Sequence, residues 1–169
     1  IAEWLCDNVQ GTVGLNPEMY SVNAFADLRN QLAEAGLSIK SVDLIRPLWV
    51  EGRPAIPQNP LYAYEEQYAG ESVSSKLARI REAMSKKKAD AMIISALDEI
   101  AWLFNIRGTD VDYNPLVIAY AVVTKSEATL FVMPEKLTAD TMKYLVSNKV
   151  AVADYECIIN AVKKIDAND

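Results

Sequence analysis

The sequence predicts an α/β protein in which helices cover both faces of a mixed sheet, a three-layer α/β/α arrangement preceded by part of a second, similar domain. Three observations lead to this prediction. Apolar residues recur at helical spacing in several segments, short apolar runs typical of strands alternate with them, and two neighbouring strand-like runs flank a three-residue turn. The chain has 169 residues, of which 51% are hydrophobic. It can therefore bury one core or two small ones.

The first part, residues 1–51, is expected to alternate helix, strand, helix and strand and to close with a short helical piece. The first strand is expected over residues 12–15. The helix after it ends before Gly36, because glycine readily takes the left-handed conformation that follows many helices. The second strand is expected over residues 37–42, and the short helical piece ends at Trp49.

Residues 52–70 are the predicted linker. They contain Pro54, Pro57, Pro60 and two of the six glycines. Proline removes a backbone donor, so we expect neither a helix nor a central strand in this stretch. The predicted domain boundary lies here.

The predicted second domain, residues 71–169, begins with a helix that Ser72 or Ser74 caps. Its apolar face consists of Val73, Leu77, Ile80 and Met84.

A buried strand over residues 90–95 is expected next. Ser95 and Asp98 then have the spacing of a capping box for a second helix, which ends at Gly108 with a positive φ. Trp102 is expected in the core of the domain.

The remaining elements are a hairpin, a helix, a strand and a last helix. The hairpin pairs residues 116–124 with 128–133 around a three-residue turn. The helices are expected over 138–147 and 157–165, with a strand over 149–153 between them.

Composition excludes several classes of function. The chain has no histidine, which rules out Ser-His-Asp and Cys-His catalysis. A net charge of −6 argues against nucleic acid as a partner. No apolar run approaches the ~20 residues of a membrane span. Cys6 and Cys157 are expected to be buried free thiols, as in the cytoplasm. The missing initiator methionine and signal peptide indicate a piece of a longer cytoplasmic protein.

The polar loop 107–115 is the candidate binding region, because loops held by a rigid scaffold often carry function. Arg107 could hold a carboxylate, although its spacing favours a surface ion pair with Asp110 or Asp112. Asp110, Asp112 and Asn114 imitate the start of a calcium loop, but the positions that follow do not fit. A two-metal, nuclease-like cluster of acidic residues is a further alternative, which the net charge disfavours. Its members would be Asp98, Glu99, Asp110 and Asp112.

Three runs of residues resemble those of a known family. The first run resembles W-x-x-R-P-x-x-P and consists of Trp49, Arg53-Pro54 and Pro57, although the spacing from Trp49 to Arg53 is one residue longer than in the family. The second run, residues 68–72, resembles the opening of that family's second domain. Residues 96–110 match A-L-D-E-I-A-W-L-F-N-x-R-G-x-D, and Asn114-Pro115 completes this most specific run. On these residues the chain resembles the three-domain Xaa-Pro aminopeptidases of the creatinase/prolidase superfamily, most clearly over residues 49–133.

The resemblance implies a metallopeptidase that removes the N-terminal residue from peptides whose second residue is proline. Two divalent ions, usually manganese, lie in its C-terminal pita-bread domain, which would be absent from this chain. Residues 1–51 would be the end of the first noncatalytic domain, 52–70 a linker, and 71–169 the second noncatalytic domain. Both would have the creatinase N-terminal fold. No catalytic residue and no metal ligand is carried over, so the chain alone is expected to be inactive.

The resemblance also implies that this segment roofs the catalytic cleft and limits it to short peptides. Asn105, Arg107 and Asp110 would then face the substrate. The implied partners are the enzyme's own catalytic domain and short Xaa-Pro peptides, with a homodimer left open; neither nucleic acid nor membrane is expected. The alternative is a free-standing α/β binding module without catalysis.

Overall fold

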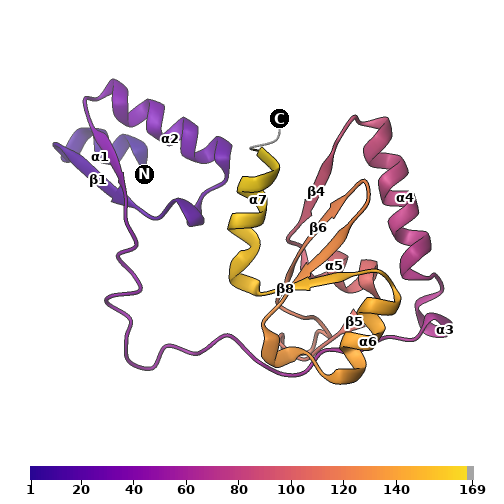
Figure 1. The fold of residues 1–169 in the computed structure, drawn as a ribbon. Coiled ribbons are helices and arrows are strands. Elements are labelled where there is room, and N and C mark those ends of the chain that lie inside the picture. The colour runs from indigo at the N-terminus through magenta and orange to yellow at the C-terminus, as the bar shows by residue number, and fades with distance from the viewer. Residues whose placement is uncertain (167–169) are drawn as a thin grey trace. The chain divides into compact units, whose positions relative to one another are not determined.

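The structure is a computed structural model that describes residues 1–166 and divides into two compact units (Figure 1). The units are Ile1–Ala55 and Ile56–Asp169, and each is described by itself. None of the described helices has the length and apolarity needed to cross a bilayer. Both cysteines are free thiols, but Cys157 is exposed, so the expected burial of both is wrong.

The first unit is small, and its two helices and two strands alternate in the predicted order, with the unpredicted 3-10 turn η1 between them. Its elements are α1 (Ala2–Asn8), β1 (Thr12–Leu15), η1 (Pro17–Met19), α2 (Val22–Glu34) and β2 (Ser38–Ser41). The two strands pair in parallel, with Thr12 opposite Ser38. Gly36 follows α2 with a φ of 76°, as predicted. A core formed by Leu28, Leu32 and Leu37 joins the helices to the strands.

The helical piece expected before Trp49 is not formed as a regular helix. The chain makes only one turn there, in which the N–H groups of Leu48 and Trp49 both donate to the carbonyl of Ile45. Pro47 lacks an N–H and cannot extend the hydrogen-bonding pattern.

The predicted absence of helix and strand in the linker is correct only up to residue 60. Beyond it lie β3 (Tyr62–Ala63) and the one-turn helix α3 (Glu66–Ala69). β3 pairs antiparallel with β5 (Ile106–Arg107), and Leu61 is buried. All three prolines of the stretch precede β3, so nothing in its second half prevents hydrogen bonding.

The second unit is built on a mixed four-stranded sheet in the order β4-β6-β7-β8. Its strands are β4 (Ala91–Ile94), β6 (Tyr120–Thr124), β7 (Ala128–Phe131) and β8 (Ala151–Ala153). The β4–β6 and β6–β7 pairs are antiparallel, and the β7–β8 pair is parallel. The predicted hairpin is confirmed, since Val123 is opposite Ala128 across the turn.

Helices cover both faces of this sheet, which confirms the predicted fold class. They are α4 (Val73–Lys86), α5 (Leu97–Phe104), α6 (Ala139–Ser147) and α7 (Ile158–Asp166), with the 3-10 turns η2 (Pro134–Lys136) and η3 (Tyr155–Cys157). The first three helices share a core with Ala121, Val123 and Leu130. α7 packs on the opposite face, against Val122 and Phe131. Alternate residues of each strand thus face the two helical layers.

The helix caps agree only partly with the sequence prediction. Ser72 caps α4 by accepting a hydrogen bond from the N–H of Ser75. The capping box predicted for Ser95 is wrong, because α5 begins one residue later and its N-cap is Ala96, which has no side-chain acceptor.

Candidate functional site

The turn after α5 contains the three residues predicted to face substrate. α5 ends at Phe104, and Asn105, not Gly108, takes the left-handed conformation, with a φ of 48°. Glycine is required at position 108 because a larger residue has no room there. A Cβ at this position would lie 2.6 Å from Cγ2 of Val117. The prediction that Gly108 ends the helix with a positive φ is therefore wrong, although glycine is needed there.

Asn105 is buried, with 2% of its surface exposed, and faces the interior of the unit. Its Oδ1 accepts a hydrogen bond of 2.6 Å from Nζ of Lys76, and its Nδ2 donates one of 2.9 Å to the carbonyl of Glu71. The side chain therefore links the start of α4 to the end of α5. Because both ends of the amide are already bonded, its geometry is that of a positioning residue.

Lys76, which with Arg79 and Met84 follows the run 68–72 that resembles the family, was not predicted as a site residue, and only 1% of its surface is exposed. Its Nζ also donates to the carbonyl of Trp102 at 2.7 Å and lies 4.8 Å from the centroid of the Trp102 ring. Burial lowers the pKa of the Lys76 ammonium below its ordinary value. The one sequence signal was its position three residues after Val73, on the apolar stripe of α4.

Arg107 belongs to β5, and its guanidinium group reaches the C-terminal end of α5, where a cation is favourable for the helix dipole. Its Nη1 donates to the carbonyls of Ala101 and Ile106, both at 2.8 Å. The guanidinium carbon lies 4.5 Å from the centroid of the Tyr64 ring. Nε and Nη2 have no hydrogen-bond partner among the described residues. The side chain is partly exposed and held in place, with donors available for a ligand.

The ion pair that spacing favoured for Arg107 is not formed. Asp110 instead pairs with Lys136, and their side chains are 1% and 0% exposed. Oδ2 of Asp110 also accepts a hydrogen bond of 2.6 Å from the N–H of Ile118, while Oδ1 is buried without a partner in the described part of the chain. Asp110 points inward because a cation from η2 lies beneath the loop, which spacing along the loop could not show.

The tip of the loop is the most exposed part of this region. Tyr113 is fully exposed and has a φ of 61°, a conformation that is strained for a bulky residue. It borders a shallow recess of about 340 Å³ formed with Tyr62, Gly108, Thr109 and other loop residues. Backbone strain of this kind clusters at functional sites, so Tyr113 joins the candidate residues, although no sequence signal had indicated it.

The acidic residues considered as a metal cluster do not come together. Asp110 is buried in its ion pair, whereas Asp98, Glu99 and Asp112 are exposed. Over residues 1–166 no group of three His, Cys, Asp or Glu side chains is placed to hold an ion. The nuclease alternative therefore lacks the site that it needs.

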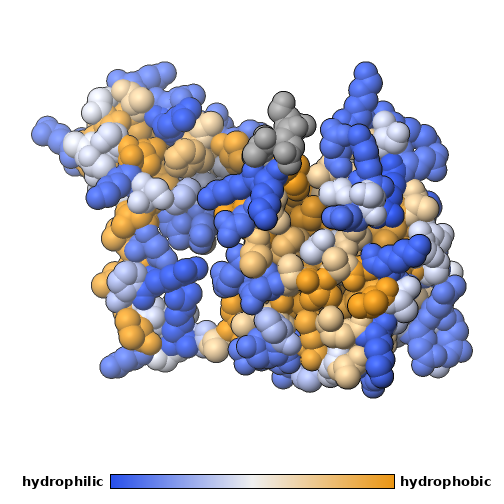
Figure 2. Space-filling view, viewed as in Figure 1, coloured by the Kyte–Doolittle hydropathy of each residue, from blue (hydrophilic) through white to orange (hydrophobic). Residues whose placement is uncertain are grey.

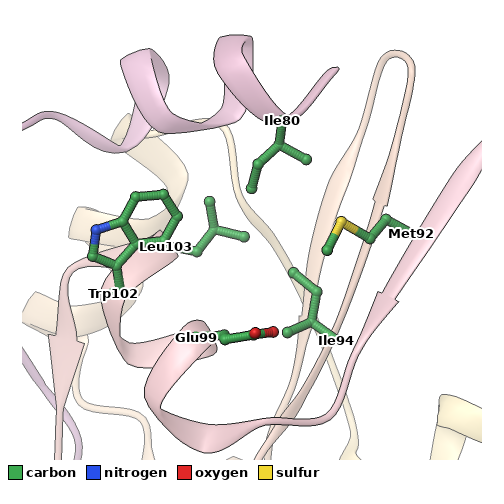
Figure 3. A pocket seen from close by; sticks show the side chains of 6 residues that line it. All are labelled: Ile80, Met92, Ile94, Glu99, Trp102 and Leu103. Carbon is green, nitrogen blue, oxygen red and sulfur yellow. The ribbon is translucent and has the colours of Figure 1, made fainter. Parts of the chain in front are cut away.

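Trp102 does not lie in the core as expected, because 41% of its surface is exposed. It lines an apolar recess between α4, α5 and β4 (Figure 3). Its ring also lies beside the cationic groups of Lys76 and Arg79. The indole therefore occupies an exposed side of α5.

We expect Trp102→Ala to lower the free energy of unfolding of this chain by roughly 1–2 kcal/mol, from partial burial and cation–π contacts. Trp102→Phe keeps an aromatic face and is expected to remain near wild type. Urea unfolding followed by circular dichroism gives both values. A loss of about 3–5 kcal/mol, typical of buried aromatics, would contradict this account.

Comparison with known proteins shows which family the chain belongs to. A model of the creatinase/prolidase N-terminal domain family matches residues 52–169. A probable Xaa-Pro aminopeptidase P of Colletotrichum graminicola is 35% identical over 175 residues, which cover 99% of this chain and 28% of the relative. One of Pyricularia oryzae is 40% identical over 161 residues, covering 92% and 26%.

A solved structure is similar over almost the whole chain. It is the crystal structure of X-prolyl aminopeptidase from Caenorhabditis elegans, described as a cytosolic enzyme with a dinuclear active site. The TM-score is 0.87 and the identity 28%, covering 99% of this chain and 28% of that one. The chain thus spans less than a third of the length of each of these relatives.

Proposed function

Because the chain belongs to the creatinase/prolidase N-terminal domain family, we propose that it is a noncatalytic segment of a metal-dependent Xaa-Pro aminopeptidase. In this proposal it roofs the active-site cleft and restricts it to short peptides with proline in second position. The observation that supports the proposal best is the similarity to X-prolyl aminopeptidase over 99% of the chain, at a TM-score of 0.87.

The two divalent ions, manganese in our proposal, belong to the rest of the parent enzyme. This chain has no histidine, and the described residues form no acidic cluster that fits an ion. The partners that we propose are the parent's catalytic domain, short Xaa-Pro peptides and, in a homodimer, a second copy. The proposed location is the cytoplasm, as described for the nematode enzyme.

In this proposal one of the three predicted site residues contacts the peptide, and the other two hold the turn in place. Arg107 contacts the peptide through Nε and Nη2, because only its Nη1 is used inside the described structure. Asn105 and Asp110 hold the turn from within, since their side chains are bonded to Lys76 and Lys136. Tyr113, exposed at the loop tip, is the second candidate for contact with the peptide.

The purified chain alone is expected to be inactive, because it lacks histidine and an ion site among its described residues. The measurement is hydrolysis of an Xaa-Pro peptide with added manganese, and the full-length parent is the positive control. Robust turnover of the peptide by the chain alone would contradict the proposal. A reading frame that stops at Asp169 would instead support a free-standing binding module.

In the full-length parent, Arg107→Ala is expected to raise KM about ten- to a hundredfold and to leave kcat nearly unchanged. A charged hydrogen bond of this kind contributes roughly 1.5–3 kcal/mol and acts on the ground and transition states alike. Steady-state kinetics measure both constants.

Arg107→Lys, which keeps the charge but loses the planar fork, is expected to lie between wild type and Arg107→Ala. The competing account is a purely structural role, because Nη1 caps the end of α5. A lowered melting temperature with unchanged KM would support that account and remove Arg107 from the binding site.

A further inference from the structure

Arg107 uses one nitrogen of its guanidinium group inside the described structure and leaves two available. The two N–H groups of Nη1 donate to the carbonyls of Ala101 and Ile106, both at 2.8 Å. Nε and Nη2, which have no partner among the described residues, present two parallel N–H groups on one edge of the planar group. Two parallel donors match the two oxygens of a carboxylate, whereas a peptide carbonyl offers a single oxygen. The free edge therefore favours a carboxylate over a carbonyl.

The plane of the guanidinium group is held in place before any ligand binds. Its carbon lies 4.5 Å from the centroid of the Tyr64 ring. The N–H of Tyr64 donates to the carbonyl of Asn105 at 2.7 Å, so this ring is itself attached to the turn. Tyr62 is directly opposite Arg107 in the β3–β5 pair. A side chain that is already ordered loses little conformational entropy when it binds a ligand, and this strengthens binding.

The charge beside the free edge is positive, although the chain carries a net charge of −6. The ammonium of Lys76 donates to the carbonyl of Trp102, one residue from the helix carbonyl that Arg107 uses. The carboxylate of Glu71 is bonded to Arg79 at 2.6 Å. Within residues 1–166, neither Lys76 nor Arg107 forms an ion pair. By contrast, the face around β4 and β6 is mainly apolar in the view of Figure 2. The turn after α5 thus favours an anion.

A shallow recess beside Arg107 has room for the residue that carries the carboxylate. Tyr62 and Gly108, which flank Arg107 across the strand pair and along the chain, both line this recess of about 340 Å³. Tyr113 and Asp112 also line it, and both are exposed. Because Asp112 repels an acidic side chain, the recess suits a residue whose only negative charge is its C-terminal carboxylate.

We infer that the free edge of Arg107 binds the C-terminal carboxylate of short peptides, so that the parent enzyme selects peptides by length. The inference rests on the proposed function, in which this turn lies over the cleft. In any one enzyme the distance from Arg107 to the reacting bond is fixed. Because an extended residue spans roughly 3.3–3.6 Å, the carboxylate reaches Arg107 at one peptide length and not at others. An acidic side chain of the catalytic domain would fit the same edge, and the experiment separates the two sources.

Pairs of peptides that differ only in a free or an amidated C-terminus test the inference in the full-length parent. The series begins with Ala-Pro-Ala and adds alanine residues up to the hexapeptide. At one length, the amide is expected to have a KM about tenfold higher than the acid, with a similar kcat, because it offers one oxygen instead of a charged pair. At the other lengths the two KM values are expected to be nearly equal. This comparison uses the unmodified enzyme and needs no variant to fold.

Variants then show which residue reads the C-terminus. Arg107→Ala is expected to abolish the preference for the acid, and Arg107→Lys, which keeps the charge without the planar fork, to retain part of it. Arg81→Ala is the matched control, because Arg81 is also partly exposed and its Nε donates to the carbonyl of Thr124 at 3.0 Å. It is expected to keep the full preference. A purely structural role of Arg107 would change the KM values of acid and amide equally and leave their ratio intact.

Three results would each overturn the inference. They are equal KM values of acid and amide at every length, a preference for the acid that survives Arg107→Ala, and a preference of the same size at all lengths. The first result is expected if Arg107 pairs with an acidic side chain of the catalytic domain, because the peptide carboxylate then has no partner there.

The same assay tests the proposed function separately. Hydrolysis of the peptides without any preference for the acid would retain that function and overturn only the inference. If the parent cleaves none of them, the proposed function fails. Calorimetric binding of acid and amide to the parent then still gives the ratio of their Kd values, and a ratio near one at every length overturns the inference as well.

Discussion

Lys136→Met is expected to lower the free energy of unfolding of this chain by about 3–5 kcal/mol, because it leaves a buried carboxylate without its cation. Lys136 and Asp110 have side chains that are 0% and 1% exposed. After the substitution the carboxylate of Asp110 keeps only the N–H of Ile118 as a partner among the described residues, and its Oδ1 is already without one.

Urea unfolding of the 169-residue chain measures this effect. Lys86→Met is the matched control, because Lys86 pairs with Glu82 on the surface of α4, and such pairs contribute only about 0–1 kcal/mol. The double variant Lys136→Met, Asp110→Asn is expected to recover most of the loss, since it removes both charges and keeps an acceptor for Ile118. If Lys136→Met cost no more than Lys86→Met, the buried pair would be ruled out.

Asn105→Ala is expected to destabilise the chain by about 2–5 kcal/mol. Loss of the amide leaves a buried polar group unsatisfied, at a cost of about 1–3 kcal/mol. Alanine in the left-handed conformation adds roughly 1–2 kcal/mol. The groups left behind are the Lys76 ammonium and the carbonyl of Glu71.

A glycine variant separates the two contributions. Asn105→Gly also removes the amide but takes a φ of 48° without strain, so it is expected to be about 1 kcal/mol more stable than Asn105→Ala. Urea midpoints of the three proteins give the comparison. Equal stability of both variants and wild type would mean that Asn105 does not hold the turn. It would then be free for the direct contact with substrate that the resemblance to the family implies.

Much of the fold was predictable because it follows from local patterns. The apolar stripe of α4, the left-handed Gly36 after α2 and the hairpin around residues 125–127 are all present. Their signals are hydrophobic period and turn chemistry, which depend on neighbours in sequence. The errors also have local causes. The predicted linker, inferred from the density of prolines, was extended too far toward residue 70, where α3 forms. The N-cap of α5 was placed one residue too early.

The candidate site was predictable in position but not in orientation. The turn after α5 was found from its residues. Which of them point inward was decided by Lys76 from α4 and Lys136 from η2, 29 and 26 residues away in sequence. No spacing rule relates side chains across such separations. Trp102 was misplaced for the same reason, since its exposure depends on how α5 packs against α4 and β4.

The sequence by itself determined the order of the main helices and strands, the α/β class and the family, because hydrophobic periodicity, turn residues and specific runs of residues are local features of the chain; it did not predict β3, α3 and β5. Only the tertiary structure decided that Asn105 and Asp110 are held from within, that Trp102 is partly exposed, and that Arg107 keeps donors available. These depend on which distant side chains meet, and packing in three dimensions sets that.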